Sequence, residues 1–383
     1  MIEFLQPVDD ELIEFSANLK ENQIGKNITQ LVDEETAIEK GAIALFFIPE
    51  YRGCCEDLCN DQDQIWSIRK SFYQLYLGNW KHELIDLGDI VPGNTLADTY
   101  FALQKVTEKI LEQEAIPFIL GGSQDLTYYQ YRAFDQIDNL VNVVSIDRCF
   151  DLGDNKQKLN NHNFLSHAIV NEPYNLFNHS VIGYQSYYND VDEIDLLDRL
   201  FFETYRLGEV VNDMKEMEPL LRDATLVSVD CSSIISISSD GKINMPNGYT
   251  SREICQLMRY AGIGERIKTL GIYEINKENN PAYNNLIPQM IWYFVEGYNF
   301  QIKEKIDVNN SNFTKFTVPI DKENLVFYFN KFSERWWIEV PCDQQNNRLK
   351  RNTLLACSKR DYINTCNQIF PERWLKAKQK SLN

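Results

Sequence analysis

The sequence lacks the features that mark membrane-spanning and secreted proteins. No stretch approaches the roughly 20 consecutive apolar residues of a transmembrane helix. Residues 1–15 have neither the basic start nor the apolar core of a signal peptide. Positive charge is also scarce, since 38 Lys and Arg stand against 56 Asp and Glu and the net charge is −18. We therefore expect a cytoplasmic protein that neither inserts into membranes nor binds nucleic acid, because phosphate surfaces attract Lys and Arg.

Paired cysteine motifs are missing as well. The 9 cysteines are an odd number, and no Cys-x-x-Cys motif is present. The one close group is Cys54, Cys55 and Cys59, whose spacing does not match a zinc module. We expect reduced cysteines that fill the core, without disulfides or a structural zinc site.

The chain does contain enough apolar material for a large core. Of its 383 residues, 44% are hydrophobic and 12% are aromatic, a composition that excludes a disordered chain. Short apolar segments typical of buried strands lie at residues 42–48, 83–87, 116–120, 141–146, 180–184, 225–229 and 269–273. Longer segments typical of helices alternate with them, at residues 62–77, 95–114, 125–134, 252–262 and 282–297. This alternation predicts a three-layer α/β/α domain with a mainly parallel sheet.

The pattern changes towards the C-terminus. Residues 309–312 consist of Asn and Ser and predict a turn-rich joint. The segments Leu325–Phe329 and Trp336–Val340 predict a hairpin. A basic tail, which we expect to be helical, then runs from Arg348 to Lys380.

These differences divide the chain into two predicted parts. We expect an α/β domain over residues 1–309 and a C-terminal extension over residues 310–383 that packs on it. Two interpretations of the basic tail are open, a contact with nucleic acid and a solvated face against an acidic body. The acidic balance of the whole chain favours the solvated face.

The chemistry of such a sheet is expected where its parallel strands end. Three predicted strands end in polar residues, within segments 119–127, 144–151 and 226–232. In the second segment Asp147, Cys149 and Asp151 alternate, so an extended backbone points all three to one side. Asp230 and Ser232 share one side of the third segment for the same reason. We therefore expect the carboxylates to converge at one edge of the sheet.

In their order, these motifs resemble those of the ureohydrolase family, which contains arginase, agmatinase and formimidoylglutamase. Gly121–Asp125 lies where the family has Gly-Gly-Asp-His-Ser, Asp147–Asp151 where it has Asp-Ala-His-x-Asp, and Ser228–Ser232 where it has Ser-x-Asp-x-Asp. Shorter matches support these three, at Ile68-Arg69, Asp86–Asp89 and Glu274–Asn276. The resemblance extends over residues 40–300 and implies the arginase-like fold.

The resemblance also implies where metal would bind, because the family holds two Mn²⁺ ions. Carried over to this sequence, the first site consists of Gln124, Asp147, Asp151 and Asp230, and the second of Asp147, Cys149, Asp230 and Ser232. Both His ligands and one Asp ligand of the family are therefore absent. The first site retains an amide oxygen and three carboxylates, which suit one hard cation such as Mn²⁺ or Mg²⁺. The second retains only the two shared aspartates and is expected to be empty.

Two interpretations of the remaining acids stay open. Carboxylates directed at one point repel one another, so a cation, a proton or a nearby base must neutralise them. A single-cation site is one interpretation, and hydrogen-bonded structural acids without a cofactor are the other. Arg148 follows Asp147, but strand alternation predicts that its side chain points to the opposite side.

Two further residues are candidates for work on a substrate. Glu274 matches a family glutamate that in arginase contacts the substrate guanidinium, and its alternative role is that of a helix N-terminal acid before Pro281. His167 is the candidate proton shuttle, since imidazole suits acid–base work near neutral pH. A surface or helix-capping histidine is the other interpretation. Cys149 lies among acids that would raise the pKa of its thiol, which argues against a nucleophile.

The missing ligands decide the functional expectation. A hydroxide made between two metal ions needs both of them to lower the pKa of water. We therefore expect a degenerate ureohydrolase-like protein, non-catalytic or altered in activity, that serves as a binding or assembly component. Its ligand would carry a cationic amidino or guanidino group. The alternative is a metal-dependent hydrolase of C–N bonds in formimidoyl or guanidino substrates. The resemblance also implies a homo-oligomer, and a protein partner is unidentified.

Overall fold

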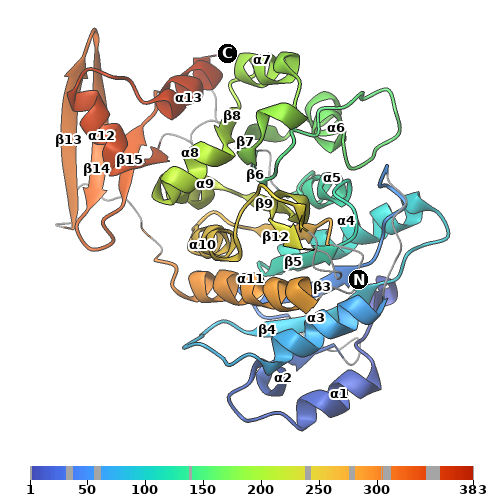
Figure 1. Cartoon of the computed structure of the whole chain (residues 1–383). Helices are drawn as coiled ribbons and strands as arrows, with labels where there is room; N and C mark the ends of the chain where they lie inside the picture. The colour runs from blue at the N-terminus through green and yellow to red at the C-terminus, as the bar shows by residue number, and fades with distance from the viewer. Residues whose placement is uncertain are drawn as a thin grey trace.

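The computed structural model describes residues 2–31, 38–55, 62–137, 140–237, 243–275, 281–302, 304, 312–341 and 354–382. A large sheet runs through the middle of the molecule, with helices on both of its faces (Figure 1). The predicted three-layer α/β/α domain is therefore present. Among the residues described, no helix has the length and apolarity that crossing a bilayer requires.

The strands of this sheet do not follow one another in chain order. Across the sheet they are β1 (Leu5–Gln6), β4 (Leu84–Ile90), β3 (Ile43–Ile48), β5 (Ile116–Gly121), β12 (Thr269–Tyr273), β9 (Leu226–Asp230), β6 (Val141–Ile146), β7 (Leu176–Tyr184) and β8 (Glu203–Arg206), and β2 (Thr29–Gln30) pairs with β4. The described pairings are parallel except that of β1 with β4. The seven predicted strands are all present to within a few residues. The sequence pattern missed β1, β2 and β8, which are short and lie at the two sides of the sheet.

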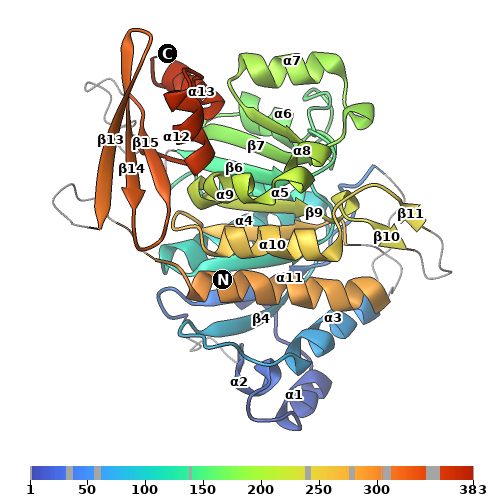
Figure 2. The same cartoon turned by 60° about the vertical axis from the view of Figure 1, so that its left-hand side comes forward.

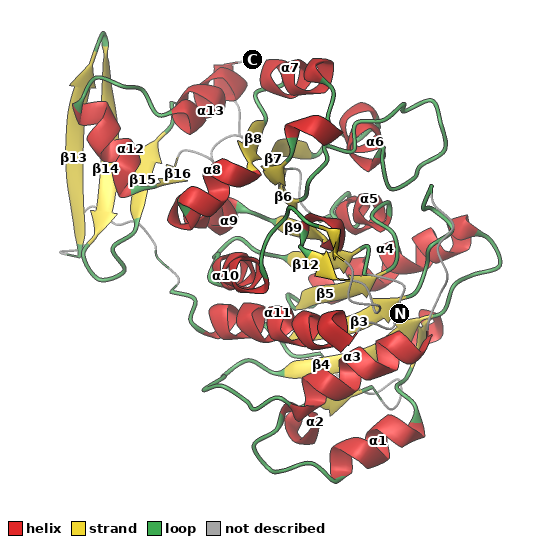
Figure 3. Cartoon of the chain, viewed as in Figure 1, coloured by secondary structure: helices red, strands yellow, loops and turns green. Residues whose placement is uncertain are grey.

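Helices cover both faces, as Figure 3 shows by colour. One face carries α1 (Asp10–Ala17), α2 (Ile24–Asn27), α3 (Gln62–Gln74), α8 (Leu207–Asn212), α9 (Glu218–Asp223), α10 (Ser251–Gly262) and α11 (Pro281–Asn299). The other carries α4 (Leu96–Glu112), α5 (Leu126–Arg132), α6 (Phe164–Val170) and α7 (Val191–Arg199). Alternate residues of β3 join the two cores, Ile43 and Phe47 on one face and Ala44 and Phe46 on the other. Both faces of the strand are therefore apolar, as in a buried parallel sheet.

The C-terminal extension forms a sheet of its own, which stands beside the main sheet (Figure 2). Its antiparallel strands are β13 (Phe313–Ile320), β14 (Glu323–Asn330), β15 (Trp336–Glu339) and β16 (Leu354–Cys357), followed by α12 (Lys359–Cys366) and α13 (Glu372–Leu382). The predicted hairpin is β14 and β15. The prediction was incomplete because β13 and β16 flank this hairpin and part of the tail is a strand. Residues 309–311 and 342–353 lie outside the described residues.

The interpretation of the basic tail as a solvated face holds for Lys359 and Arg360, which are exposed, but not for Arg373. The side chain of Arg373 is 12% exposed and its Nε lies 3.1 Å from Glu203 Oε2, at the start of β8. From the main domain, Arg222 Nη2 donates to the backbone oxygens of Trp336 at 3.0 Å and Cys357 at 3.3 Å. Buried ion pairs and hydrogen bonds therefore attach the extension to the domain. The boundary at residue 309 stays a prediction.

Candidate functional site

Four acidic residues meet at the carboxyl ends of three neighbouring strands, β6, β9 and β12. Asp147 and Asp151 follow β6, Asp230 is the last residue of β9, and Glu274 directly follows β12. Burial and the charge of Asp230 raise the pKa of each of the other three. We call Asp147, Asp151, Asp230 and Glu274 the acid cluster. It occupies the edge at which parallel sheets bind their ligands.

Backbone N–H groups orient two of these carboxylates. The N–H of Cys149 donates to Asp147 Oδ1 at 2.9 Å, and the N–H of Ser232 donates to Asp230 Oδ1 at 2.5 Å. Each aspartate thus bonds to the residue two positions later, as in an Asx-turn. Both turns are local, and they hold the carboxylates at the sheet edge whatever binds there.

Glu274 is held from two other segments of the chain. Its Oε1 accepts from the N–H of Gln124, at the start of α5, at 2.9 Å. Its carboxylate also bonds to the side chain of Asn161, and this bond favours its charged form. Asn161 Oδ1 in turn accepts from the N–H of Cys55 at 3.0 Å. Asn161 therefore links the acid cluster to the loop after β3, a role that sequence reasoning missed because no motif marks it.

The acid cluster holds protons more tightly than ordinary carboxyl groups. Burial raises the pKa of Asp147 and Asp151 well above its usual range, and neighbouring acids add to this effect. Burial and Asp230 raise the pKa of Glu274 to about 7. Within the described residues, no N–H or O–H donates to Asp147 Oδ2, and Asp147 and Asp151 share a side-chain hydrogen bond. The cluster therefore needs protons or a cation at neutral pH.

Two members of the cluster have a strained backbone. Asp151 has φ 53° and Glu274 has φ 52°, in the left-handed region that residues other than glycine rarely adopt. Such strain persists where the surrounding structure holds it, and it is concentrated at ligand and active sites. The same backbone conformation occurs at six described non-glycine residues outside the cluster, so it is not specific to this site.

The residues at the three former ligand positions, two of His and one of Asp, behave differently from metal ligands. Burial and the neighbouring acids raise the pKa of the Cys149 thiol, as the sequence predicted, so it stays neutral at pH 7. Gln124 Nε2 donates to Ser228 Oγ at 3.0 Å, and within the described residues its buried Oε1 has no hydrogen-bond partner. Ser232 contributes its backbone N–H to Asp230.

This donor set does not fit a pair of manganese ions. Over the described ranges, no group of three or more His, Cys, Asp or Glu side chains is arranged to hold a metal ion. A neutral thiol and a hydroxyl group are poor ligands for Mn²⁺. Within the described residues, Gln124 Oε1 and Asp147 Oδ2 are buried atoms without a hydrogen-bond partner that a single cation would satisfy, so that weaker prediction stays open.

His162 and the predicted proton shuttle His167 lie on either side of the start of α6. His162 Nδ1 is 3.8 Å from Asp151 Oδ1, and its side chain is 52% exposed. His167 lies inside α6 and packs its ring on that of Tyr128, with centroids 6.0 Å apart. The structure thus brings His162 to the acid cluster, and the shuttle role of His167 stays a prediction. Asn276 of the third supporting motif lies outside the described residues.

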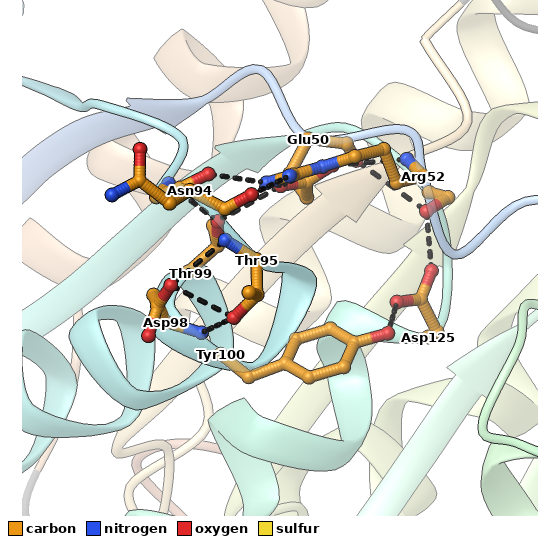
Figure 4. Close-up of polar contacts among 10 residues, drawn as sticks. Glu50, Arg52, Asn94, Thr95, Asp98, Thr99, Tyr100 and Asp125 are labelled. Atoms are coloured by element: carbon orange, nitrogen blue, oxygen red, sulfur yellow. Dashed lines mark hydrogen bonds and ion pairs between the residues drawn. The ribbon is translucent and has the colours of Figure 1, made fainter.

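A further buried acid, Asp125, adds to the raised pKa of Glu274 and is drawn in Figure 4. Asp125 accepts hydrogen bonds from Tyr100 on α4 and from the hydroxyl of Ser123. Burial raises the pKa of Asp125 to about 7 against these two bonds. A Cβ atom at Gly53 would lie 2.1 Å from Asp125 Oδ2, so this position in the loop after β3 requires glycine.

The same loop carries an ion pair between an exposed arginine and a buried glutamate. Arg52 Nη2 lies 2.5 Å from Glu50 Oε2, and Thr99 Oγ1 donates to Glu50 Oε2 at 2.9 Å (Figure 4). Arg52 also donates to the backbone oxygen of Gly93 at 2.9 Å. These bonds attach the loop to the start of α4. Arg52 neutralises the negative charge of Glu50, so we assign this ion pair a structural role.

The family of the chain is evident from a comparison of sequences. The sequence model of the arginase family matches residues 63–287, which contain the whole acid cluster. The chain belongs to the arginase family. The match ends before the C-terminal extension, so the antiparallel sheet is an addition to the arginase-family domain.

Several arginase-family proteins are similar to this chain. A formimidoylglutamase of Staphylococcus epidermidis is 23% identical over 234 residues, which cover 57% of this chain and 72% of that protein. A second, of Staphylococcus haemolyticus, is 31% identical over 71 residues, 18% of this chain and 23% of that protein.

Solved structures share the fold. Formiminoglutamase of Trypanosoma cruzi, crystallised with Mn²⁺, superposes with a TM-score of 0.61 at 18% identity, over 73% of this chain and 99% of that one. Formimidoylglutamase of Bacillus subtilis superposes with a TM-score of 0.61 at 14% identity, over 72% of this chain and 91% of that one. At these identities the likeness establishes the arginase-family fold.

Proposed function

We propose that this chain is a ligand-binding member of the arginase family that does not use the family's two-metal hydrolysis. Its ligand is a small molecule with a singly charged amidino or guanidino group, which the acid cluster neutralises. The observation that carries this proposal is the concentration of four buried carboxyl groups beside a neutral Cys149 thiol. A planar cation offers several N–H donors to such carboxylates and makes bidentate bonds with them.

Two binding measurements test the proposal. Protein purified without chelator is assayed for metal by plasma emission, then titrated calorimetrically with Mn²⁺, formamidinium and guanidinium. We expect no stoichiometric metal, and heat from the organic cations that disappears in an Asp147→Asn/Asp230→Asn double variant. One tightly held metal ion per chain, lost in the double variant, would contradict the proposal.

The second candidate function is hydrolysis of a C–N bond in a formimidoyl or guanidino substrate with one divalent cation. The names of the similar proteins and the orphaned oxygen of Gln124 favour it. Release of ammonia or urea from N-formimidoyl-L-glutamate, arginine or agmatine in the presence of Mn²⁺ is the test. Turnover that the double variant abolishes would replace the binding role with this one.

An assembly role remains part of the proposal. The extension adds a sheet that the family match does not cover, and it presents a surface for a second copy or another protein. Light scattering tests for a homo-oligomer by measuring the mass of the unaltered chain and of an Arg373→Met variant, whose extension lacks the ion pair with Glu203.

A further inference from the structure

A cavity of about 40 Å³ lies between the main domain and the C-terminal extension. Its lining includes the first residues of β7 and β8 and part of α13, the helix that stands between the antiparallel sheet and the main sheet in Figure 2. The cavity is therefore at the amino ends of the parallel strands, whereas the acid cluster is at their carboxyl ends. One water needs about 10–15 Å³ of such space, so the cavity has room for about three or four water-sized groups.

Apolar side chains form one part of the lining. Val144 and Phe177 contribute from the main sheet, Leu220 from α9, and Leu355 and Ala377 from the extension. Both parts of the chain thus enclose the cavity, which exists only while the extension is docked on the domain.

Charged side chains form another part of the lining, and basic residues outnumber acidic ones. They are Arg266, Arg373, Lys380, Glu203 and Asp223. Each arginine is paired with an acid, since Arg373 Nε is 3.1 Å from Glu203 Oε2 and Arg266 Nη1 is 3.5 Å from Asp223 Oδ1. Among the described residues, no carboxylate forms an ion pair with Lys380. The cavity therefore has one positive charge in excess.

The amine of Lys380 is held by neutral groups of the main domain. Its Nζ donates to Asn178 Oδ1 on β7 and lies 5.9 Å and 5.0 Å from the centres of the Phe177 and Phe202 rings. An ammonium group has three N–H donors, so the bond to Asn178 leaves others for a further acceptor. Burial lowers the pKa of Lys380 to about 8, and the amine is still mainly charged at pH 7. A buried cation without an anion is costly, and a bound anion offsets that cost.

We infer that this cavity binds a small monocarboxylate of the size of acetate, whose carboxylate pairs with Lys380 and whose methyl group lies against the apolar lining. Its single negative charge matches the excess positive charge of the cavity. Because the lining comes from both parts of the chain, the bound anion strengthens the docking of the extension. The site is independent of the proposed function, since the acid cluster lies at the other end of the strands.

Two substitutions on α13 test this site. Lys380→Met removes the charge and retains the apolar stem, whereas Ala377→Val fills part of the cavity and retains Lys380. Equilibrium dialysis measures the binding of radiolabelled acetate, and thermal unfolding is followed in sodium acetate and in sodium chloride of equal ionic strength. Lys378→Met is the matched control, because Lys378 lies on the same helix but pairs with Glu323 and does not line the cavity.

We expect the unaltered chain to bind one acetate and to unfold at a higher temperature in acetate than in chloride, because a ligand of the folded state alone stabilises it. Acetate affinity should fall about tenfold or more in Lys380→Met, as loss of a charge-assisted bond implies. It should fall similarly in Ala377→Val, and Lys378→Met should match the unaltered chain.

Three results would overturn the inference. The first is that the unaltered chain binds no acetate, which would leave the cavity to water. The second is an equal rise in unfolding temperature in chloride and acetate, since the apolar lining would then have no role. The third is an acetate affinity that Lys380→Met and Ala377→Val leave unchanged, because acetate would then bind elsewhere on the chain.

Discussion

Glu274 Oε1 accepts a hydrogen bond at 2.9 Å from the backbone N–H of Gln124, a residue 150 positions away in the sequence. The bond joins the end of β12 to the turn after β5. It means that the carboxylate is oriented before any ligand arrives. Preorganised groups bind a ligand without losing further conformational freedom, so this contact bears directly on affinity.

Replacing Glu274 with Gln separates charge from position. The amide oxygen of Glu274→Gln still accepts from the N–H of Gln124, whereas the negative charge is lost. We expect affinity for guanidinium to fall about tenfold, which is the loss of one charge-assisted bond of about 1.4 kcal/mol. Calorimetric titration measures this fall, and thermal unfolding should show little change.

Glu274→Ala is the companion variant. It also leaves the Gln124 N–H without its acceptor, so we expect it to be less stable than Glu274→Gln by about 1 kcal/mol. Equal guanidinium affinity in Glu274→Gln and the unaltered chain would remove Glu274 from the binding site.

The raised pKa of Asp147 predicts how the stability of the folded chain depends on pH. Because its pKa is raised in the folded state, the folded chain keeps a proton that the unfolded chain releases above about pH 4. Its contribution to the free energy of unfolding therefore falls as pH rises towards the raised pKa. Asp147→Asn cannot titrate, and its Oδ1 still accepts from Cys149. We expect it to be more stable than the unaltered chain at pH 8, by on the order of 1–3 kcal/mol, and to lose this advantage at pH 5.

Urea unfolding at both pH values measures this difference. Asp195→Asn is the control, since Asp195 is an exposed acid on α7 and its substitution should have no such effect. A gain in stability that is the same at pH 5 and pH 8 would show that ionisation of Asp147 does not destabilise the folded chain.

Much of the fold was predictable because buried strands have a strong signature. The segments at residues 141–146 and 269–273 are apolar on both faces, and they are β6 and β12 with the predicted bounds. β13 was missed because its exposed Lys315, Thr317 and Pro319 alternate with buried and partly buried residues and interrupt any apolar run. β13 is a strand because it pairs with β14, and its own sequence carries no information on that pairing.

The acid cluster was predictable in part for a similar reason. Asp147 and Asp230 directly follow apolar strands, so their place at the sheet edge follows from topology. Asn161 was not predictable in this way, because its role depends on a loop that returns from a distant part of the chain. His162 reaches Asp151 through such a loop, whereas sequence spacing had favoured His167.

The docking of the extension depends on Arg373. Its Nε is 3.1 Å from Glu203 Oε2 and its Nη2 is 3.5 Å from Asp223 Oδ2. Arg373→Met leaves two buried carboxylates without this cation, and loss of one partner of a buried pair costs about 3–5 kcal/mol. We expect a fall of that order in the free energy of unfolding, together with faster proteolysis of the extension.

Arg360→Met is the matched control on the same tail. Arg360 Nη1 lies 3.7 Å from Asp213 Oδ2, and the two side chains are 64% and 43% exposed. An exposed pair contributes about 1 kcal/mol or less, so this variant should unfold almost like the unaltered chain. Similar losses in both variants would show that tail charge in general, and not the buried pair, holds the extension.

For Lys380 on α13 we expect a pH dependence of stability opposite to that of Asp147. Burial lowers its pKa to about 8, and its Nζ lies 5.0 Å from the centre of the Phe202 ring. Between pH 8 and about 10.4 the unfolded chain holds a proton that the folded chain has lost, so stability from this group rises with pH across that window. Lys380→Met removes the buried charge while it retains the apolar stem. The variant should therefore exceed the unaltered chain in stability at pH 7, by on the order of 1–3 kcal/mol, and this excess should shrink by pH 10. Urea unfolding at the two pH values measures this excess in stability. If the excess of Lys380→Met grows between pH 7 and pH 10, the buried amine is instead stabilised as a cation by Glu203 and the aromatic rings.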